Sequence, residues 1–232
     1  MKTVLITGAA GGLGSAFVRE YLKDGYFVIG CDVRQIEEEE LKKVNHFFYF
    51  KVDIRYEEQI KNLAEKLKEI HIDAIDVLIN CAGILPENSA HVLEEFEIDG
   101  ALDVFNVNAL GALRMVKIFL AFLKKGDEKQ IINISSEAGS IATHAGYTYR
   151  YDYCMSKAAL NIQSVILQRY LWEDGLKVFL FHPGWMRTRM GGEQAPIMPE
   201  LSAKEIKRTI EEVKNNYEDI RLIDYNGVCR PW

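Results

Sequence analysis

The sequence predicts an α/β fold, a doubly wound parallel sheet of about seven strands with helices on both faces. Two observations lead to this prediction. Short runs rich in Val, Ile, Leu and Phe recur along the chain with little polar alternation, which is typical of strands buried on both faces. Longer charged segments with helical periodicity separate these runs. This β-α-β rhythm predicts parallel strands joined by right-handed crossovers.

The elements follow in chain order from this rhythm. Apolar runs predict strands at residues 3–7, 27–31, 46–52, 76–80, 130–135, 177–181 and 220–224. Helical spacing of apolar residues predicts helices at residues 15–23, 57–70, 102–123 and 153–172. The acidic block at 37–40 is interpreted as the solvated face of a short helix. Residues 191–199, which include two Gly and two Pro, are interpreted as a long loop of the kind that often forms a lid.

The composition indicates a single domain spanning residues 1–232. Hydrophobic residues make up 48% of the chain and charged residues 27%, which is ordinary for a globular protein. The formal net charge of −6 argues against nucleic acid as a partner, because phosphate contacts need a basic excess. We find no apolar run near the ~18 residues of a membrane span. The four cysteines form no Cys-x-x-Cys pair, so we expect a cytoplasmic protein without a metal site or a membrane partner.

A glycine-rich turn directly follows the first predicted strand. It contains Gly8, Gly11, Gly12 and Gly14, and a predicted helix follows it. Glycine lets the backbone approach a phosphate closely, and the helix N-terminus offers unpaired N–H groups to negative charge. A glycine cluster alone is weak evidence, but its position between a strand and a helix predicts the dinucleotide-binding turn of a Rossmann-type fold. A P-loop is excluded because no Lys follows Gly14.

Asp32 ends the second predicted strand, 24 residues after Gly8. A carboxylate there can accept hydrogen bonds from both ribose hydroxyls and would repel a 2′-phosphate, which favours NAD(H) over NADP(H). Two alternatives remain open. Asp32 could cap a helix or face a loop, or the chain could be a methyltransferase that uses the same ribose contact for S-adenosylmethionine.

Tyr153 and Lys157 lie one helical turn apart in the fourth predicted helix. An ammonium group beside a phenol favours the phenolate and should lower a tyrosine pKa from its usual value of about 10, as a general acid/base requires. This spacing also arises by chance, and alone it fits a surface Tyr–Lys pair. Ser136 adds a hydroxyl at the end of a predicted central strand, where parallel sheets bind ligands. The hydroxyl could stabilise charge on a carbonyl oxygen or simply cap a turn.

Six motifs stand in a familiar order along the chain. They are Thr7-Gly8-x-x-x-Gly12-x-Gly14, Asp53-Ile54, Asn80-Cys81-Ala82-Gly83, Asn108-Ala109-Leu110-Gly111, Ser136 with Tyr153 and Lys157, and Pro183-Gly184-Trp185-Met186-Arg187-Thr188. Together they resemble the short-chain dehydrogenase/reductase family, in its compact single-domain branch. Residues 182–192, 195–196 and 224–232 resemble the C-factor and sniffer-type carbonyl reductase group of that family. Cys81 replaces the family's second Asn, and Arg189 stands where that group often has Asp.

The resemblance implies the site and its chemistry. The catalytic residues would be Ser136, Tyr153, Lys157 and Asn108. The cofactor-binding residues would be Gly8, Gly11, Gly12, Leu13, Gly14, Asp32, Asp53, Ile54, Asn80, Ala82, Gly83, Tyr153, Lys157, Pro183, Gly184, Met186 and Thr188. Tyr153 would protonate a carbonyl oxygen, to which Ser136 hydrogen-bonds, while the nicotinamide delivers hydride. Lys157 would hold the nicotinamide ribose, and Asn108 would position a proton-relaying water.

The predicted function is therefore an NAD(H)-dependent oxidoreductase that interconverts an alcohol and a carbonyl on a small molecule, with NADP(H) as the alternative cofactor. The alternative function is a nucleotide-sensing regulatory or signalling protein on the same scaffold. A lid loop around residues 186–200 and the loop with His144 and Tyr147 would shape the substrate pocket. Surplus apolar residues on two helices predict a homodimer or homotetramer. They are Phe119, Leu120, Phe122, Leu123, Ile166, Leu167, Tyr170 and Leu171.

Overall fold

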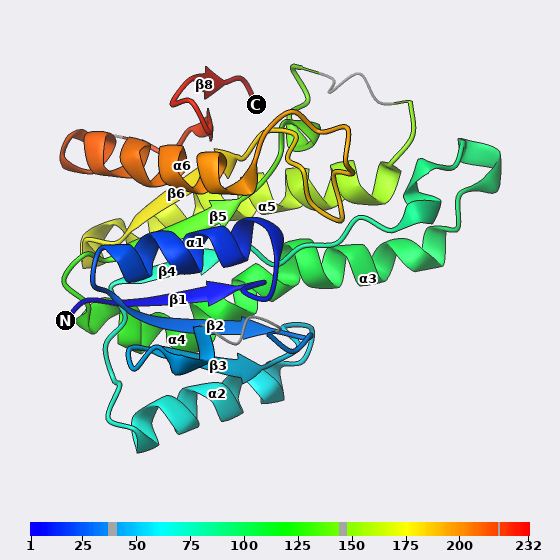
Figure 1. The fold of residues 1–232 in the computed structure, drawn as a ribbon. Helices are drawn as coiled ribbons and strands as arrows, with labels where there is room; N and C mark the ends of the chain where they lie inside the picture. Colours follow the sequence, from blue (N-terminus) through cyan, green and yellow to red (C-terminus); the bar gives the residue numbers. More distant parts are fainter. Residues whose placement is uncertain (37–40, 144–147, 218) are drawn as a thin grey trace.

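An eight-stranded sheet runs through the chain in the order β3-β2-β1-β4-β5-β6-β7-β8 (Figure 1). The computed structural model describes residues 1–36, 41–143, 148–217 and 219–232, so the acidic block at 37–40 and the loop residues His144 and Tyr147 lie outside the described residues. The strands are β1 Thr3–Thr7, β2 Phe27–Asp32, β3 Phe47–Lys51, β4 Val77–Asn80, β5 Gln130–Ile134, β6 Lys177–His182, β7 Leu222–Asp224 and β8 Cys229–Arg230. The first seven pair in parallel, and β8 adds an antiparallel edge. The predicted α/β sheet is confirmed, with one strand more than the predicted seven.

Helices cover both faces of the sheet (Figure 1). They are α1 Gly12–Lys23, α2 Glu57–Glu69, α3 Ala101–Phe105, α4 Ala112–Lys125, α5 Tyr151–Leu171 and α6 Pro199–Val213. One core cluster joins the sheet to α2, α4 and α5. The other joins the opposite face to α1 and α6. The central strands β1 and β5 are buried along their whole length, because they lie between these two layers.

The structure differs from the predicted elements in two helical regions. The predicted helix at 102–123 is interrupted by a π-helical turn, Asn106–Gly111, between α3 and α4. Such turns widen a helix locally and occur often at functional sites. The helix α6 was missed, although Pro199 at its start and the buried Ala203, Ile206 and Ile210 give it a helical pattern. Pro199 and Glu200, at the end of the predicted lid loop, belong to α6.

Most of the apolar residues predicted to be surplus lie in the protein's own core. Phe119, Phe122, Leu123 and Leu171 are buried, and Leu120 and Leu167 are partly buried against the same cluster. The reason is that α4 packs against both the sheet and α2, so it needs more than one apolar stripe. Ile166 and Tyr170 are exposed, and Ile162 joins them on the same face of α5.

One helical segment meets the length and composition of a membrane span. It is Ile98–Lys125, with a mean hydropathy of 1.4, and 44% of its apolar window is buried inside the protein. No other helix of the described residues meets that standard. Core helices of water-soluble proteins meet it as well.

Candidate active site

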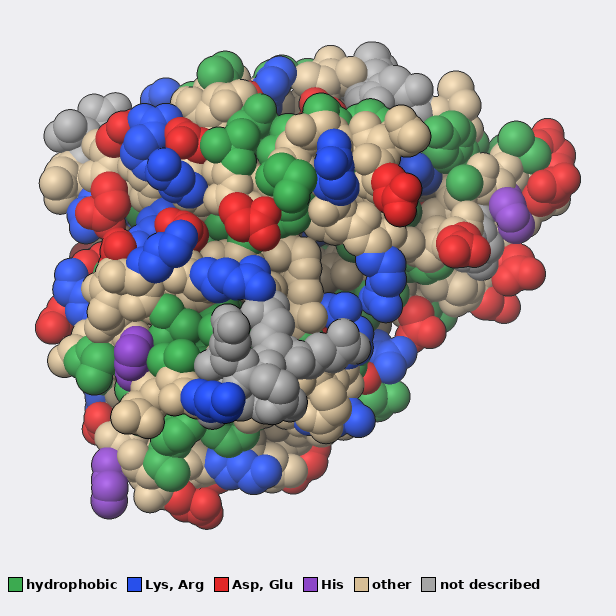
Figure 2. All heavy atoms as spheres, viewed as in Figure 1, with side chains coloured by type: hydrophobic (Ala, Val, Ile, Leu, Met, Phe, Trp, Pro, Cys, Tyr) green, Lys and Arg blue, Asp and Glu red, His purple; other side chains and the backbone are tan. Residues whose placement is uncertain are grey.

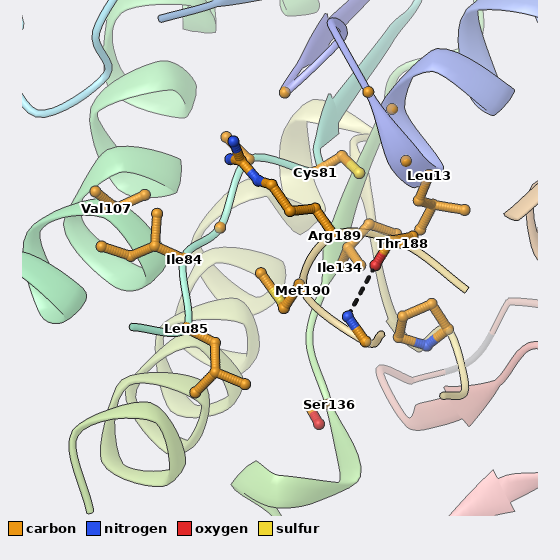
Figure 3. A pocket seen from close by; sticks show the side chains of 18 of the residues that line it. Leu13, Cys81, Ile84, Leu85, Val107, Ile134, Ser136, Thr188, Arg189 and Met190 are labelled. Carbon is orange, nitrogen blue, oxygen red and sulfur yellow. Dashed lines mark hydrogen bonds between the residues drawn. The ribbon is translucent and has the colours of Figure 1, made fainter. Parts of the chain in front are cut away.

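A cavity of about 760 Å³ opens at the carboxyl ends of the parallel strands. The strand order reverses between β1 and β4, and in open parallel sheets ligands bind at such a switch point. Figure 3 shows the side chains that enter the cavity from the two sides of this edge. The predicted site residues that line it are Gly8, Gly11, Gly12, Leu13, Gly14, Asp32, Asp53, Ile54, Ala82, Gly83, Ser136, Tyr153, Lys157, Pro183, Gly184, Met186 and Thr188.

The glycine-rich turn has the geometry of a phosphate cradle. Gly8 and Gly12 have φ of 72° and 53°, a region that favours glycine. A Cβ on Gly14 would lie 2.1 Å from the Gly8 carbonyl oxygen, so glycine is required for α1 to start this close to β1. Within the described residues, no side chain caps the N-terminus of α1 and its first turn holds no acidic residue. The turn therefore fits the pyrophosphate of a dinucleotide.

Asp32 lies at the end of β2, buried and surrounded by donors. Its Oδ2 accepts hydrogen bonds from the Ala10 N–H (3.1 Å) and Arg34 Nη2 (3.0 Å). Its Oδ1 accepts from the Arg34 N–H (3.0 Å) and Nε (3.2 Å). The Arg34 guanidinium also covers Gly11, with Nη1 3.1 Å from the position of a Cβ there. The end of the cavity at β2 thus holds a carboxylate and a guanidinium side by side.

Asp53 and Arg55 repeat this arrangement after β3. Arg55 donates from Nη2 (2.7 Å) and Nε (3.1 Å) to Asp53 Oδ2. Burial opposes ionisation of Asp53, but the hydrogen bonds from Arg55 outweigh it and hold its pKa below the usual value. Both residues line the cavity. Asp53 was predicted to bind the cofactor, whereas Arg55 was not singled out. The same Asp-x-Arg pattern occurs at the ends of β2 and β3 and is visible in the sequence.

Lys157 is the buried cation of the site. Its Nζ donates to the Ile134 carbonyl oxygen (2.9 Å) and lies 5.7 Å from the centroid of the Tyr153 ring. Burial lowers the pKa of Lys157 to about 8. The structure therefore brings Tyr153 and Lys157 together on the cavity side of α5, as the four-residue spacing predicts.

Ser136 lines the cavity just after the end of β5. Its Oγ accepts a hydrogen bond from the Ala138 N–H (3.1 Å) and so caps the turn Glu137–Gly139. No acceptor for the Ser136 O–H occurs among the described residues, and the side chain lines the cavity (Figure 3). Capping and substrate binding are therefore compatible. The neighbouring Ser135 is turned away and donates to Asn161 Oδ1 (2.5 Å).

Asn108 and Asn80 lie behind the lining of the cavity. Asn108, in the π-helical turn, accepts from the Ile84 N–H (2.8 Å) and donates to the Ile84 carbonyl (3.0 Å) and to Ser156 Oγ (3.1 Å). It thereby fixes the segment after β4 beside Lys157. Asn80 donates to Asn133 Oδ1 (2.8 Å) between β4 and β5, so the structure places it as a brace of the sheet.

Main-chain hydrogen bonds stabilise residues 186–198, the segment between β6 and α6 in which the lid was predicted. Met186 bridges to Ile197, and Arg187 N–H donates to the Ile197 carbonyl (2.7 Å). The Gly191 N–H donates to Thr188 Oγ1 (3.1 Å), at the bond marked on Thr188 in Figure 3. The Thr188 methyl carbon lies 3.2 Å from the position of a Cβ on Gly12. The lid therefore meets the glycine-rich turn over the middle of the cavity.

Comparison with known proteins agrees with this geometry. The profile of the short chain dehydrogenase family matches residues 2–198. The chain belongs to the short-chain dehydrogenase family. It is 34% identical over 161 residues to C-signal of Myxococcus xanthus, covering 68% of this chain and 93% of that protein.

Solved structures of this dehydrogenase family match the whole chain. The carbonyl reductase Sniffer of D. melanogaster has a TM-score of 0.90 and 27% identity, covering 100% of both chains. The NADPH-bound carbonyl reductase from chicken fatty liver has a TM-score of 0.87 and 25% identity, covering 100% of this chain and 99% of that one. The present protein is thus an oxidoreductase of the short-chain dehydrogenase family.

The cavity lining of this dehydrogenase also holds residues that were not predicted from the sequence. Apolar side chains enter the cavity at Ile84, Leu85, Val107 and Met190 (Figure 3). Trp185 lies at the rim, half exposed, and donates from Nε1 to the Gly191 carbonyl (2.7 Å), so it forms part of the lid. These residues come from three segments, which sequence spacing alone does not connect.

His182 and Glu137 lie beside Ser136 in the lining. His182 Nε2 is 3.8 Å from Glu137 Oε1. Burial lowers the pKa of His182, and the Glu137 carboxylate opposes that shift. Among the described residues no group of three or more His, Cys, Asp or Glu side chains could hold a metal ion.

A C-terminal strap, residues 229–232, supports the turn that follows Ser136. Ser140 Oγ donates to the Pro231 carbonyl (2.6 Å), and the Ala142 N–H donates to the Trp232 main-chain oxygen (2.7 Å). Arg230 anchors the strap by donating from Nη2 (2.8 Å) and Nε (3.0 Å) to the buried Asp224. These contacts join segments about 90 residues apart and leave no local signal in the sequence.

Proposed function

We propose that the protein interconverts an alcohol and a carbonyl compound with NAD(H), and that Tyr153 is its general acid/base. The observation that carries the proposal is the convergence of Tyr153, Lys157 and Ser136 on a cavity continuous with the glycine-rich turn. A methyltransferase would need the turn and Asp32 but would have no use for these three side chains.

Three side chains would act on the carbonyl oxygen and on the proton that it receives. Tyr153 Oη donates a proton to the carbonyl oxygen during reduction and takes it back during oxidation. Ser136 Oγ–H donates a hydrogen bond to the same oxygen and stabilises its developing charge. The Lys157 ammonium favours the phenolate of Tyr153 and contributes to binding the cofactor's ribose. When bound, the nicotinamide donates or accepts the hydride.

Two further sets of residues would complete the site. The glycine-rich turn, Asp32 and Asp53 would hold the adenosine and pyrophosphate, while Pro183, Gly184, Met186 and Thr188 would border the nicotinamide. Asn108, which is hydrogen-bonded to Ile84 and Ser156, would hold the segment after β4 in place beside Lys157. The lid would exclude water, and its apolar neighbours favour a substrate with an apolar body around the carbonyl.

The activity is tested by following the absorbance of NADH and NADPH in parallel over a panel of aldehydes, ketones and quinones. The proposal expects turnover with at least one carbonyl. Binding of NADH without turnover of any carbonyl would instead favour a nucleotide-sensing or signalling role. The similarity to a protein named C-signal favours that role as the second candidate.

Asp32→Ala is expected to lower kcat/KM for NADH by about 10-fold or more and to improve the relative use of NADPH. The reason is that hydrogen bonds to a charged carboxylate contribute about 1.5–3 kcal/mol, and removing the charge removes repulsion of a 2′-phosphate. Arg34 competes for the same carboxylate, and its guanidinium could instead meet a 2′-phosphate. Steady-state kinetics of both variants, Asp32→Ala and Arg34→Ala, separate these effects.

The cofactor preference of the parent protein provides a second test of the NAD(H) proposal. A parent that prefers NADPH, and whose preference is lost in Arg34→Ala, would contradict the NAD(H) proposal. It would place this protein with the NADPH-bound carbonyl reductase from chicken fatty liver.

We propose a homodimer or homotetramer that uses α5. Ile162, Ile166 and Tyr170 are four residues apart and more than half exposed, so they form an apolar stripe. Ile166→Glu should lower the molar mass measured by light scattering, whereas Ile70→Glu, at the end of α2, should not. A monomeric parent would contradict the proposal.

The cytoplasmic location stays a prediction.

A further inference from the structure

The cavity is lined by five cationic side chains with unequal surroundings. Arg34 and Arg55 are paired with Asp32 and Asp53, and Lys157 donates to the Ile134 carbonyl. The fourth, Arg150, packs over the Tyr149 ring at 5.3 Å. Arg189 is the fifth and forms no hydrogen bond, ion pair or ring contact with any residue that the structure describes. On the face shown in Figure 2, several Lys and Arg side chains surround the central hollow.

Arg189 projects into the cavity from a rigid turn (Figure 3). The turn is held by hydrogen bonds from the Thr188 N–H to the Met186 carbonyl (2.9 Å) and from the Gly192 N–H to the Thr188 carbonyl (2.8 Å). A Cβ on Gly191 would lie 2.0 Å from the Met186 carbonyl oxygen, so the turn is closely packed. The turn fixes the Arg189 backbone, and the exposed side chain can orient its planar guanidinium toward a ligand oxygen.

The surrounding charges indicate what Arg189 would bind. Asp32 and Asp53 are already paired, and Glu137 lies toward His182. The N-terminus of α1, which the turn approaches at Thr188 and Gly12, adds positive potential rather than negative. The cavity thus offers an arginine without a carboxylate partner in the described chain, beside a helix N-terminus that carries partial positive charge.

We infer that Arg189 binds an anionic oxygen group inside the cavity. The inference rests on the proposed function. The group comes from one of two sources, the pyrophosphate of the cofactor or an acidic substituent on the carbonyl substrate. Arginine matches both, because its planar donors form paired hydrogen bonds with phosphate and carboxylate oxygens.

Arg189→Ala is compared with the parent in two assays. In the first, calorimetry measures the binding of ADP-ribose, NADH and adenosine, which needs no turnover. In the second, kcat/KM is measured for 4-carboxybenzaldehyde and for its neutral methyl ester. A loss of about 10- to 100-fold for ADP-ribose and NADH, with adenosine unchanged, assigns the pyrophosphate. A similar loss confined to the carboxylate substrate assigns the substrate.

Two control variants accompany these assays. Arg187→Ala removes the same charge from the same loop, at a residue outside the cavity lining. It should change the binding affinity and kcat/KM by less than about twofold. Arg189→Lys should recover part of the loss seen in Arg189→Ala. The inference is overturned if Arg189→Ala alters neither assay, or if Arg187→Ala alters both equally. Retained ADP-ribose binding through Arg189 without any carbonyl turnover would overturn the proposed function alone.

Discussion

Replacing Tyr153 with Phe is expected to lower carbonyl turnover by about 10²- to 10⁴-fold, the usual contribution of general acid catalysis. The change removes one hydroxyl and keeps the ring that faces Lys157 Nζ at 5.7 Å. Since the cofactor's pyrophosphate and adenosine would bind elsewhere in the cavity, the dissociation constant of NADH should change little. Fluorescence titration with NADH and single-turnover kinetics measure the two quantities separately.

Tyr151 provides a matched control in the same helix. It packs against Phe96, with ring centroids 5.5 Å apart, and lies outside the cavity lining. Tyr151→Phe should therefore retain turnover. Equal activity in the parent and Tyr153→Phe would contradict the assigned acid, and equal losses in the two variants would indicate a structural effect.

Lys157→Met is expected to abolish most of the activity and to stabilise the folded protein in the same step. Burial lowers the pKa of Lys157 to about 8, so folding carries the cost of a buried charge at neutral pH. A shift of this size corresponds to about 3 kcal/mol. Loss of the hydrogen bond to Ile134 offsets about 1 kcal/mol, which leaves a net gain of about 2 kcal/mol at pH 7. Functional sites often carry such a stability cost.

The pH dependence of this gain follows from the direction of the pKa shift. The pKa of Lys157 in the folded protein lies below its usual value of 10.5. The unfolded chain therefore binds more protons between pH 8 and 10.5, and the stability of the parent rises through that window. The free-energy cost of burying the Lys157 ammonium group applies in full below pH 8 and decreases above it. Urea unfolding of both proteins at pH 7 and pH 10 should show the variant's advantage shrinking. An advantage independent of pH, or a destabilised variant, would contradict a buried ammonium.

The fold was predictable because its strongest signals are local. β1 and β5 each hold three Val, Ile or Leu residues among five and are buried at every position, as strands between two helical layers are. The glycine-rich turn marks where β1 passes into α1. The proximity of Tyr153 to Lys157 was predictable for the same reason, since both lie on one face of α5. The ion pairs of Arg34 and Arg55 also had a local signal, in two Asp-x-Arg sequences after neighbouring strands.

Features that depend on distant contacts were not predictable. The π-helical turn places Asn108 against Ile84, 24 residues earlier, and no periodicity in 102–123 reveals it. The strap depends on Ser140 meeting Pro231, 91 residues away. Burial of Phe119 and Phe122 depends on α2 packing over α4, which made these residues seem surplus when α4 was considered alone.

The central claim is hydride transfer to a carbonyl carbon with Tyr153 as the acid. It is tested most directly by incubating the protein with NADH deuterated at C4, in each of the two stereochemical forms, and an aldehyde that is turned over. The account predicts one deuterium on the carbinol carbon of the product, from one form of labelled NADH, at a rate that collapses in Tyr153→Phe. Oxidation of NADH that leaves no deuterium in the alcohol would contradict it.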